Sequence, residues 1–292
     1  MKSGTILLTI FLFMFLRIAA AGKISTLNHK AILTRTYSWV YDSCRFNMKL
    51  SFKQSDYKYY RSKSKKTAST QSYVRFLTED FSRPYLNMVL QRLDSISQPC
   101  GFNKSEFAGF IIAFVQQAIF YKKDPFNWGM DYPRYAIETL VDHHGDCEDM
   151  ACLMLALLRT MNYDVALVTM PGHMAAGIAC ADCSGRHFIF NGQKYFFVET
   201  TGPNNPIGYE ADEMMMREHH LYYVPQSACS AQEGDSTEEN MIQKFANESC
   251  NSQSDEKPCS YQSSSGFGAH VAGQSPSRVI EIREMHVCDD VN

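Results

Sequence analysis

Three residues of this sequence could together carry out covalent chemistry: Cys147, His173 and Glu199. They follow one another at equal intervals of 26 positions. A thiol becomes a strong nucleophile when an imidazole takes its proton, and a carboxylate can hold that imidazole in the required tautomer. The residue types and their order therefore predict a nucleophilic thiol site. The alternative is that His173 only begins a strand after the Pro171-Gly172 turn and that Glu199 is solvated.

The residues around Cys147 predict the start of a buried helix. Gly145 ends the preceding segment, and all nine residues from Met150 to Leu158 are apolar. A helix that is apolar on every side lies in the core of a protein. Asp146 is the expected N-cap, and Asp149 can reach back to it as in a capping box. Cys147 would then lie in the first turn, where unpaired backbone N–H groups and the helix dipole favour a thiolate.

The acidic neighbours of Cys147 act against a thiolate. Asp146, Glu148 and Asp149 flank the thiol, and nearby negative charge raises the pKa of a thiol. First-turn carboxylates can instead cap the helix and point away from the sulfur. The two arrangements have opposite effects on Cys147, and the sequence leaves both open.

Strands are expected after this helix. The runs 164–170 and 173–180 predict two strands, and 187–198 predicts a hairpin that turns at Asn191-Gly192. Alternation puts small residues on the face of His173, so that a helix terminus or a substrate backbone could approach it. These small residues are Ala175, Gly177 and Ala179.

Glu199 follows the last of these strands. Tyr195 and Phe197 share its face by alternation. A carboxylate that is buried beside two aromatic rings needs a partner. His173 is the candidate for that partner.

The first half of the chain predicts extended segments followed by helices. Aromatic and apolar residues nearly alternate over 36–50, and over 73–121 they recur at spacings of three and four, which indicates two helices separated near 98–104. Helices that precede strands suggest an α+β fold with an antiparallel sheet. The basic, tyrosine-containing stretch 58–66 is interpreted as a solvated loop and not as a nucleic-acid site, because nothing else in the chain is basic.

Composition and charge exclude several classes of protein. The chain has 292 residues, of which 45% are apolar and 20% charged, and its formal net charge is -3. This composition suits one large or two small globular domains and excludes disorder of the whole chain. The net charge provides no general attraction to nucleic acid or to anionic lipid.

The N-terminus has the pattern of a cleaved signal peptide, which we expect over residues 1–21. Lys2 precedes an apolar run over 6–16, and three alanines follow it. The run is too short to span a membrane. We therefore expect a secreted or extracytoplasmic protein without stable membrane insertion, and a retained N-terminal anchor is the alternative. The ten cysteines fit an oxidising compartment.

A change of composition near residue 226 predicts two regions in the rest of the chain. We expect a folded domain over 22–225 and a Ser- and Gln-rich, mostly disordered tail over 226–292. One late element is expected near 279–287.

Several groups of residues together resemble microbial members of the transglutaminase-like superfamily. They are the run YPRYAIETL at 132–140, Gly145-Asp146-Cys147-Glu148-Asp149, Pro171-Gly172-His173-Met174 and Glu199-Thr200-Thr201. The helix motif at 114–116 and Ile207-Gly208 also match, so the resemblance covers about residues 37–209. Any one of these motifs alone would be unspecific. The resemblance implies a papain-like core, in which a central helix with Cys at its N-terminus packs on an antiparallel sheet.

The same resemblance implies roles for individual residues. Cys147 would be the nucleophile, His173 the base and Glu199 the residue that orients His173. Gln116 would donate to the oxyanion together with the Cys147 backbone N–H. The better-known transglutaminases have Asp as the third residue and Trp near the His, where this chain has Glu199 and Met174. This departure counts against transfer to an amine, so we expect hydrolysis of an amide or peptide bond through a Cys thioester.

Other functions stay open at this stage. A binding module could keep the fold without turnover, and a protein-crosslinking acyl transferase would use the same thioester. A metal-dependent protein would use Cys180, Cys183 and His187, but their C-x2-C pair lacks the second pair that zinc sites have. We therefore expect a disulfide or a reduced hairpin tip there, and an unpaired, buried Cys152. We expect no cofactor or metal and a protein or peptide substrate, and the sequence does not predict the oligomeric state.

Overall fold

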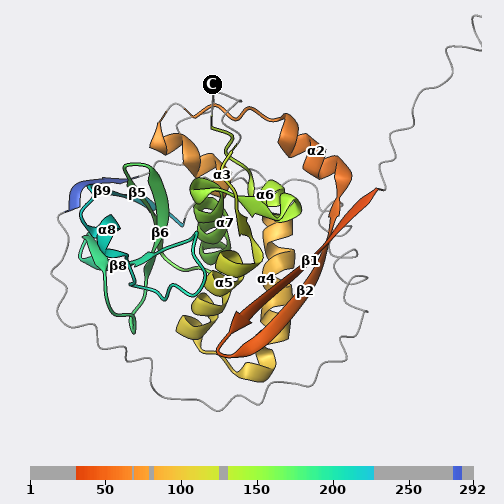
Figure 1. Ribbon diagram of the computed structural model, residues 1–292, viewed down its shortest axis with the longest axis horizontal. Coiled ribbons are helices and arrows are strands. Elements are labelled where there is room, and N and C mark those ends of the chain that lie inside the picture. Colours follow the sequence, from red (N-terminus) through yellow and green to blue (C-terminus); the bar gives the residue numbers. More distant parts are fainter. Residues whose placement is uncertain (1–30, 68, 79–81, 125–130, 227–278, 285–292) are drawn as a thin grey trace, which may run out of the picture.

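The computed structural model of the protein describes residues 31–67, 69–78, 82–124, 131–226 and 279–284 (Figure 1). The predicted signal peptide lies outside these residues, as do 227–278 and 285–292 of the predicted tail. The described chain is a mixed α+β fold in which a two-stranded hairpin comes first, helices follow it, and a curled, mainly antiparallel sheet comes last. The predicted fold class is confirmed at this level.

The described chain begins with a long antiparallel hairpin of β1 (Ile32–Tyr41) and β2 (Cys44–Lys53). This hairpin confirms the extended segments predicted over 36–50. Its core face is formed by alternate residues, as the period of a strand requires. These buried residues are Tyr37, Trp39, Phe46, Met48, Leu50 and Phe52.

The basic stretch 58–66 differs from the solvated loop predicted for it. Its first part belongs to helix α2 (Gln54–Ser62), and Tyr60 within it is fully buried. The Tyr60 ring packs on Tyr135, with ring centroids 5.0 Å apart. The ammonium of Lys65 lies 4.4 Å from the centre of the Tyr135 ring and pairs with the buried Glu138. The loop prediction was wrong at these positions because Tyr60 packs on Tyr135 and Lys65 pairs with Glu138, contacts that a count of charges does not reveal, whereas Tyr59 is exposed.

Helices form most of the described chain between β2 and Cys147. Short helices η1 (Thr70–Tyr73) and α3 (Val74–Thr78) precede the long α4 (Arg83–Ser97) and α5 (Lys104–Ala118). The break between α4 and α5, which contains η3 (Gln98–Cys100), lies where the sequence predicted it. Within the described residues no helix has the length and apolarity needed to cross a membrane.

Helix α7 (Cys147–Thr160) lies at the centre of the molecule, as its apolar sequence predicted (Figure 1). Every residue from Glu148 to Arg159 is buried. The helix packs against β5 and β6 on one side and against α3, α4, α5 and α6 (Ala136–Asp142) on the other. Its first turn is held beside a two-stranded parallel pair, β3 (Phe120–Tyr121) with β4 (His144–Gly145).

The six-stranded sheet has the order β10-β9-β5-β6-β8-β7. Its pairs are antiparallel except for β10, which runs parallel to β9 at one edge. The predicted hairpin turns at Asn191 and Gly192, whose φ values of 49° and 78° suit a tight hairpin turn. The short helix α8 (Asp212–Met215) precedes β9. The strands are β5 (Val165–Met170), β6 (His173–Ala179), β7 (His187–Phe190), β8 (Gln193–Val198), β9 (His219–Val224) and β10 (Val279–Glu284).

The two faces of β6 belong to different parts of the core. Met174, Ala176 and Ile178 pack in the large core that contains α7. Ala175, on the opposite face, packs in a second core with Phe188 and Phe197 inside the curl of the sheet. We expected the small residues on the His173 face to let a helix terminus approach, but α7 packs on the opposite face of β6. The His173 face contributes Ala175 to the second core instead.

Candidate active site

Cys147 is the first residue of α7, and Asp146 before it has the extended backbone of an N-cap, as predicted. The backbone N–H of Asp146 donates to Oδ2 of Asp149 at 3.3 Å, which is the reciprocal bond of a capping box. The preceding Gly145 is required at its position, because a Cβ there would lie 2.5 Å from the Cβ of Asp149. The first turn of the helix is therefore tightly fixed.

The backbone at the start of β6 acts on the Cys147 thiol. The N–H of Met174 works to lower the pKa of this thiol, against the larger effect of burial. Met174 is the second residue of β6 and His173 is the first. The start of α7 and the start of β6 thus meet at the thiol, although the two residues are far apart in the sequence.

His173 is paired with Glu199, which directly follows β8. Nε2 of His173 lies 2.9 Å from Oε2 of Glu199, and the side chains are only 11% and 7% exposed. The other oxygen, Oε1, accepts hydrogen bonds from the backbone N–H and the hydroxyl of Thr201 at 2.8 and 2.7 Å. Burial acts to raise the pKa of Glu199, but His173 and Thr201 together hold it below its ordinary value. An ionised Glu199 therefore fixes the His173 ring through Nε2, and Nδ1 is the ring nitrogen that Glu199 does not engage.

Gln116 lies on α5 and is buried behind Glu199. Its Nε2 donates to the backbone carbonyl of Glu199 at 2.7 Å and to that of Asn205 at 2.9 Å. An amide nitrogen has two hydrogens, so both are directed at these carbonyls. In this geometry Gln116 holds the segment after β8 and has no hydrogen left for an oxyanion.

The acids beside Cys147 do not all point away from the thiol. The Cys147 thiol donates to Oε2 of Glu148 at 3.2 Å. Burial, followed by the charge of Glu148 and the hydrogen bond to it, raises the pKa of the Cys147 thiol, while the Met174 N–H acts in the opposite direction. Of the two arrangements that the sequence left open, the structure has the one in which an acid faces the sulfur.

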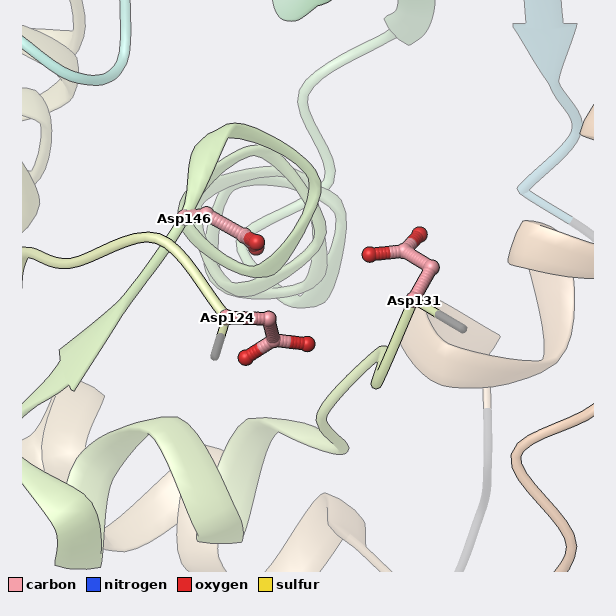
Figure 2. Close-up of side chains that lie close together, drawn as sticks. All are labelled: Asp124, Asp131 and Asp146. Carbon is pink, nitrogen blue, oxygen red and sulfur yellow. The ribbon is translucent and has the colours of Figure 1, made fainter. Parts of the chain in front are cut away.

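Three aspartates form a cluster at the same end of α7 (Figure 2). One carboxylate oxygen from each of Asp124, Asp131 and Asp146 lies within 4.8 Å of the others. Arg134 lies next to this cluster, with Nη1 3.0 Å from Oδ1 of Asp124, and it also pairs with the buried Asp149. The sequence analysis missed Asp124 and Asp131, since neither lies in a motif and only the fold brings them to α7.

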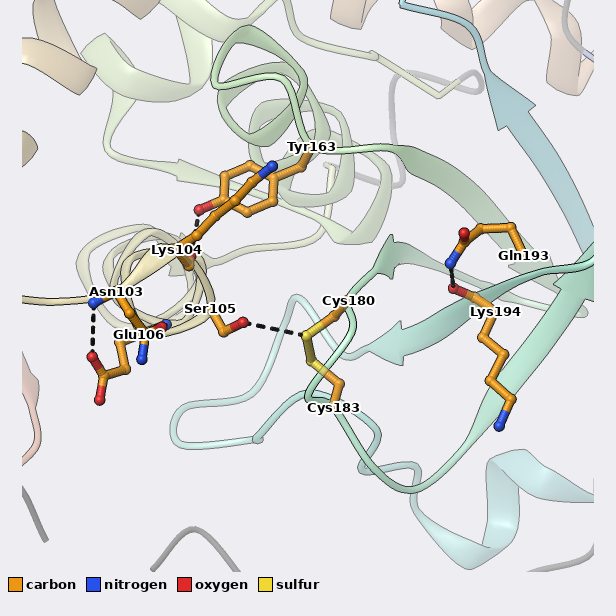
Figure 3. Close-up of a disulfide and its surroundings, with 9 residues drawn as sticks. All are labelled: Asn103, Lys104, Ser105, Glu106, Tyr163, Cys180, Cys183, Gln193 and Lys194. Carbon is orange, nitrogen blue, oxygen red and sulfur yellow. Dashed lines mark hydrogen bonds between the residues drawn. A yellow bond between two sulfur atoms is a disulfide. The ribbon is translucent and has the colours of Figure 1, made fainter. Parts of the chain in front are cut away.

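The cysteines of the proposed zinc site form a disulfide instead (Figure 3). Cys180 and Cys183 are joined by an S–S bond of 2.09 Å, which confirms the disulfide predicted for this pair. Ser105 of α5 lies 3.7 Å from the Cys180 sulfur. Neither thiol is therefore available as a zinc ligand. Cys147 and Cys152 are free thiols, and Cys152 is buried within α7 as expected.

Two further residues near the site had no sequence signal. Tyr121 of β3 pairs in register with Gly145, and its side chain is 45% exposed. Burial and then the charges of Cys147 and Asp146 raise the pKa of Tyr121. Asn205, whose carbonyl accepts from Gln116, lies in the turn-rich segment after Glu199.

Comparisons with known proteins do not assign the chain to a family. No protein-family model matches the chain, and no curated protein matches it. Among solved structures, the crystal structure of a "putative protease" from Parabacteroides distasonis aligns with 60% of this chain and 39% of that chain. The identity is 10% and the TM-score is 0.31. This similarity is too low to assign either a fold family or a reaction to the protein.

Proposed function

We propose that the protein is a thiol hydrolase with a transglutaminase-like core, which cleaves amide or peptide bonds through a Cys147 thioester. The observation that carries this proposal is the hydrogen-bonded pair of His173 and Glu199 at the start of β6, the strand whose second residue, Met174, acts on the Cys147 thiol. In this proposal Cys147 is the nucleophile, His173 the base and Glu199 the residue that orients the base.

The proposed reaction begins with transfer of the thiol proton to Nδ1 of His173. The sulfur then attacks the substrate carbonyl carbon, and the backbone N–H of Cys147 donates to the developing oxyanion. This N–H belongs to the first turn of α7, where backbone donors have no partner within the helix. The imidazolium returns its proton to the leaving amine, and water then hydrolyses the thioester. Gln116 is given a positioning role here, because it holds the backbone of Glu199.

The domain arrangement belongs to the same proposal. A signal peptide over 1–21 would direct the domain over 22–225 out of the cytoplasm, and the tail over 226–292 would follow it. The Cys180–Cys183 disulfide is compatible with an oxidising compartment. A protein or peptide is the proposed substrate.

A second candidate function is a binding module that has the fold without turnover. The hydrogen bond from the Cys147 thiol to Glu148 favours it, because the thiol is held protonated. In that case the His173–Glu199 pair would only stabilise the start of β6.

Alkylation by iodoacetamide, followed residue by residue with mass spectrometry, distinguishes the two candidates. For a thiol hydrolase, Cys147 is modified much faster than the buried Cys152, and His173→Ala removes the difference. The same variant and Cys147→Ser abolish cleavage of a fluorescently labelled unfolded protein. Equal, slow labelling of both cysteines in the wild type would instead support the binding module.

A further inference from the structure

Carboxyl groups outnumber cationic side chains beside Cys147, and burial followed by the neighbouring acids raises the pKa of Asp146 and raises that of Glu148 to about 10. Five carboxylates gather around the first turn of α7, and two of them, Asp124 and Asp149, are paired with Arg134. Within the described parts of the chain, no cationic side chain lies within 4.0 Å of the other three. These three are Asp131, Asp146 and Glu148.

Asp146 is buried at the centre of this charge without a full set of partners. The residue is 8% exposed, and its Oδ1 has no hydrogen-bond partner. Figure 2 shows the carboxylates of Asp146 and Asp131 pointing toward each other, with Asp124 beside them. Buried polar oxygens are nearly always paired. An unpaired oxygen among like charges therefore calls for a donor from outside the chain.

The negative charge extends from the surface to the sulfur. Asp131 is exposed and accepts a hydrogen bond from the Tyr73 hydroxyl at 2.8 Å, and it is among the acids that raise the pKa of the buried Glu148, after the larger effect of burial. Glu148 in turn accepts the hydrogen bond of the Cys147 thiol at 3.2 Å. A group that binds these acids would thus lie next to the reacting atom.

The spacing of the aspartates accommodates a cation with several N–H donors. Three acceptors about 2.8 Å from one tetrahedral ammonium nitrogen lie ~4.6 Å apart, and the three aspartate oxygens all lie within 4.8 Å of one another. Arg134, whose Nη1 is 3.0 Å from Oδ1 of Asp124, already provides one cationic partner on this side of the cluster. A peptide substrate can bring a second one as a lysine ammonium or an arginine guanidinium.

From this geometry we infer that Asp124, Asp131 and Asp146, together with Glu148, bind a lysine or arginine side chain of the substrate beside Cys147. The naming of a peptide substrate rests on the proposed function. The preference for a cation near the sulfur does not depend on the proposed function, so the cation site and the proposed function can fail separately.

The first experiment measures that preference without turnover. Thiosulfonate reagents that carry either a trimethylammonium or a sulfonate group are reacted with the full-length protein, and modification of Cys147 is followed by peptide mass spectrometry. Each rate is divided by the rate with a small free thiol, which removes the intrinsic reactivity of the reagent. We expect the cationic reagent to be favoured by about tenfold or more at low salt, and the ratio to fall as salt is added.

Asp131→Asn is the informative variant, because this exposed residue can change without disturbing the core. It should lower the ratio at least about threefold, as expected when one charge near the sulfur is removed. Glu213→Gln, which removes an exposed acid from α8, is the matched control and should leave the ratio unchanged. A wild-type ratio near one, or a ratio that Asp131→Asn does not alter, would overturn the inference.

The second experiment connects the subsite to the substrate. Two fluorogenic peptides are compared that differ only in lysine or its uncharged analogue norleucine near the scissile bond. We expect a KM about tenfold higher for the norleucine peptide, and Asp131→Asn should remove this difference.

If neither peptide is cleaved while the reagent preference persists, the proposed function fails and the cation subsite stands. If Ca²⁺ raises the melting temperature of the wild type but not of Asp131→Asn, and the reagents show no preference, the acids serve a metal and the inference is overturned.

Discussion

Nε2 of His173 lies 2.9 Å from Oε2 of Glu199. The pairing of β6 with β8 brings the two side chains to this distance. In the β6–β8 ladder Ala176 pairs with Val198, so the first residue of β6 lies opposite the residues that follow β8. The ladder thus sets the distance between imidazole and carboxylate, and Thr201 fixes the carboxylate from its other side. The pair is preorganised before any substrate arrives.

Glu199→Gln should keep the fold and lose most of the reactivity. A glutamine has nearly the same shape, but it cannot stabilise an imidazolium and can hold the wrong tautomer. By analogy with other thiol and hydroxyl sites, turnover should fall by about 10²- to 10⁴-fold. Peptide cleavage and the alkylation rate of Cys147 measure this effect, and the thermal unfolding curve provides the control for folding. Unchanged alkylation in this variant would mean that the pair does not serve the thiol.

The depressed pKa of Glu199 also predicts a pH-dependent contribution to stability. Its unfolded pKa is about 4.3, and His173 and Thr201 hold the folded value below its ordinary level. Between the folded and the unfolded pKa of Glu199, the folded state therefore binds fewer protons than the unfolded state. The resulting stabilisation is present above the unfolded pKa and is lost as the pH falls through the folded pKa.

Urea unfolding of the wild type and of Glu199→Gln at several pH values checks this sign. The difference in unfolding free energy should be largest and constant above about pH 5 and should shrink below about pH 4. A difference that grows toward acid pH would contradict the assignment of an ionised Glu199.

Much of the site could be predicted because its signals are local. The capping residues Asp146 and Asp149 precede an apolar run, and this pattern fixes both the start of α7 and the position of Cys147. The hairpin turn at Asn191-Gly192 likewise sets the register of β8, and with it the position of Glu199. Helix caps and hairpin turns depend on a few neighbouring residues, so they can be read from the sequence.

The features that escaped prediction depend on contacts between distant segments. Alternation predicted which residues share a face with His173, but not that α7 packs on the opposite face with Met174. No local rule could direct Glu148 toward the thiol, because the groups that act on its carboxyl include Asp131 from another segment. Gln116 had a plausible donor group, yet the two carbonyls that it binds come from residues more than 80 positions away.

The position of Gln116 leads to a prediction that separates a positioning role from a direct role in catalysis. Gln116→Ala leaves the carbonyls of Glu199 and Asn205 without their donor. We expect a loss of about 1–3 kcal/mol in unfolding free energy for the buried groups, together with slower alkylation of Cys147. The neighbouring Gln117, which donates to exposed groups at Val40 and Asn204, is the matched control, and Gln117→Ala should cost less. Reduced turnover with unchanged stability and alkylation would point to an oxyanion donor instead.

A substitution at Glu148 should favour the reactive, ionised form of the Cys147 thiol, whereas mutations near a nucleophile usually cause a loss of function. Its carboxylate accepts the Cys147 thiol hydrogen bond and helps to raise the pKa of that thiol, after the larger effect of burial. Burial raises the pKa of Glu148 to about 10, so Glu148 is ionised at the alkaline pH at which the thiol titrates, and Glu148→Gln removes that charge but keeps the size of the side chain. The thiol pKa should therefore fall, and the pH at which alkylation of Cys147 reaches half its maximum should move to lower values. The pH profile of iodoacetamide labelling measures this shift, with Glu218→Gln as a control that changes an acid outside the site. A midpoint that stays in place, or that moves to higher pH, would show that Glu148 does not hold the thiol in its protonated form.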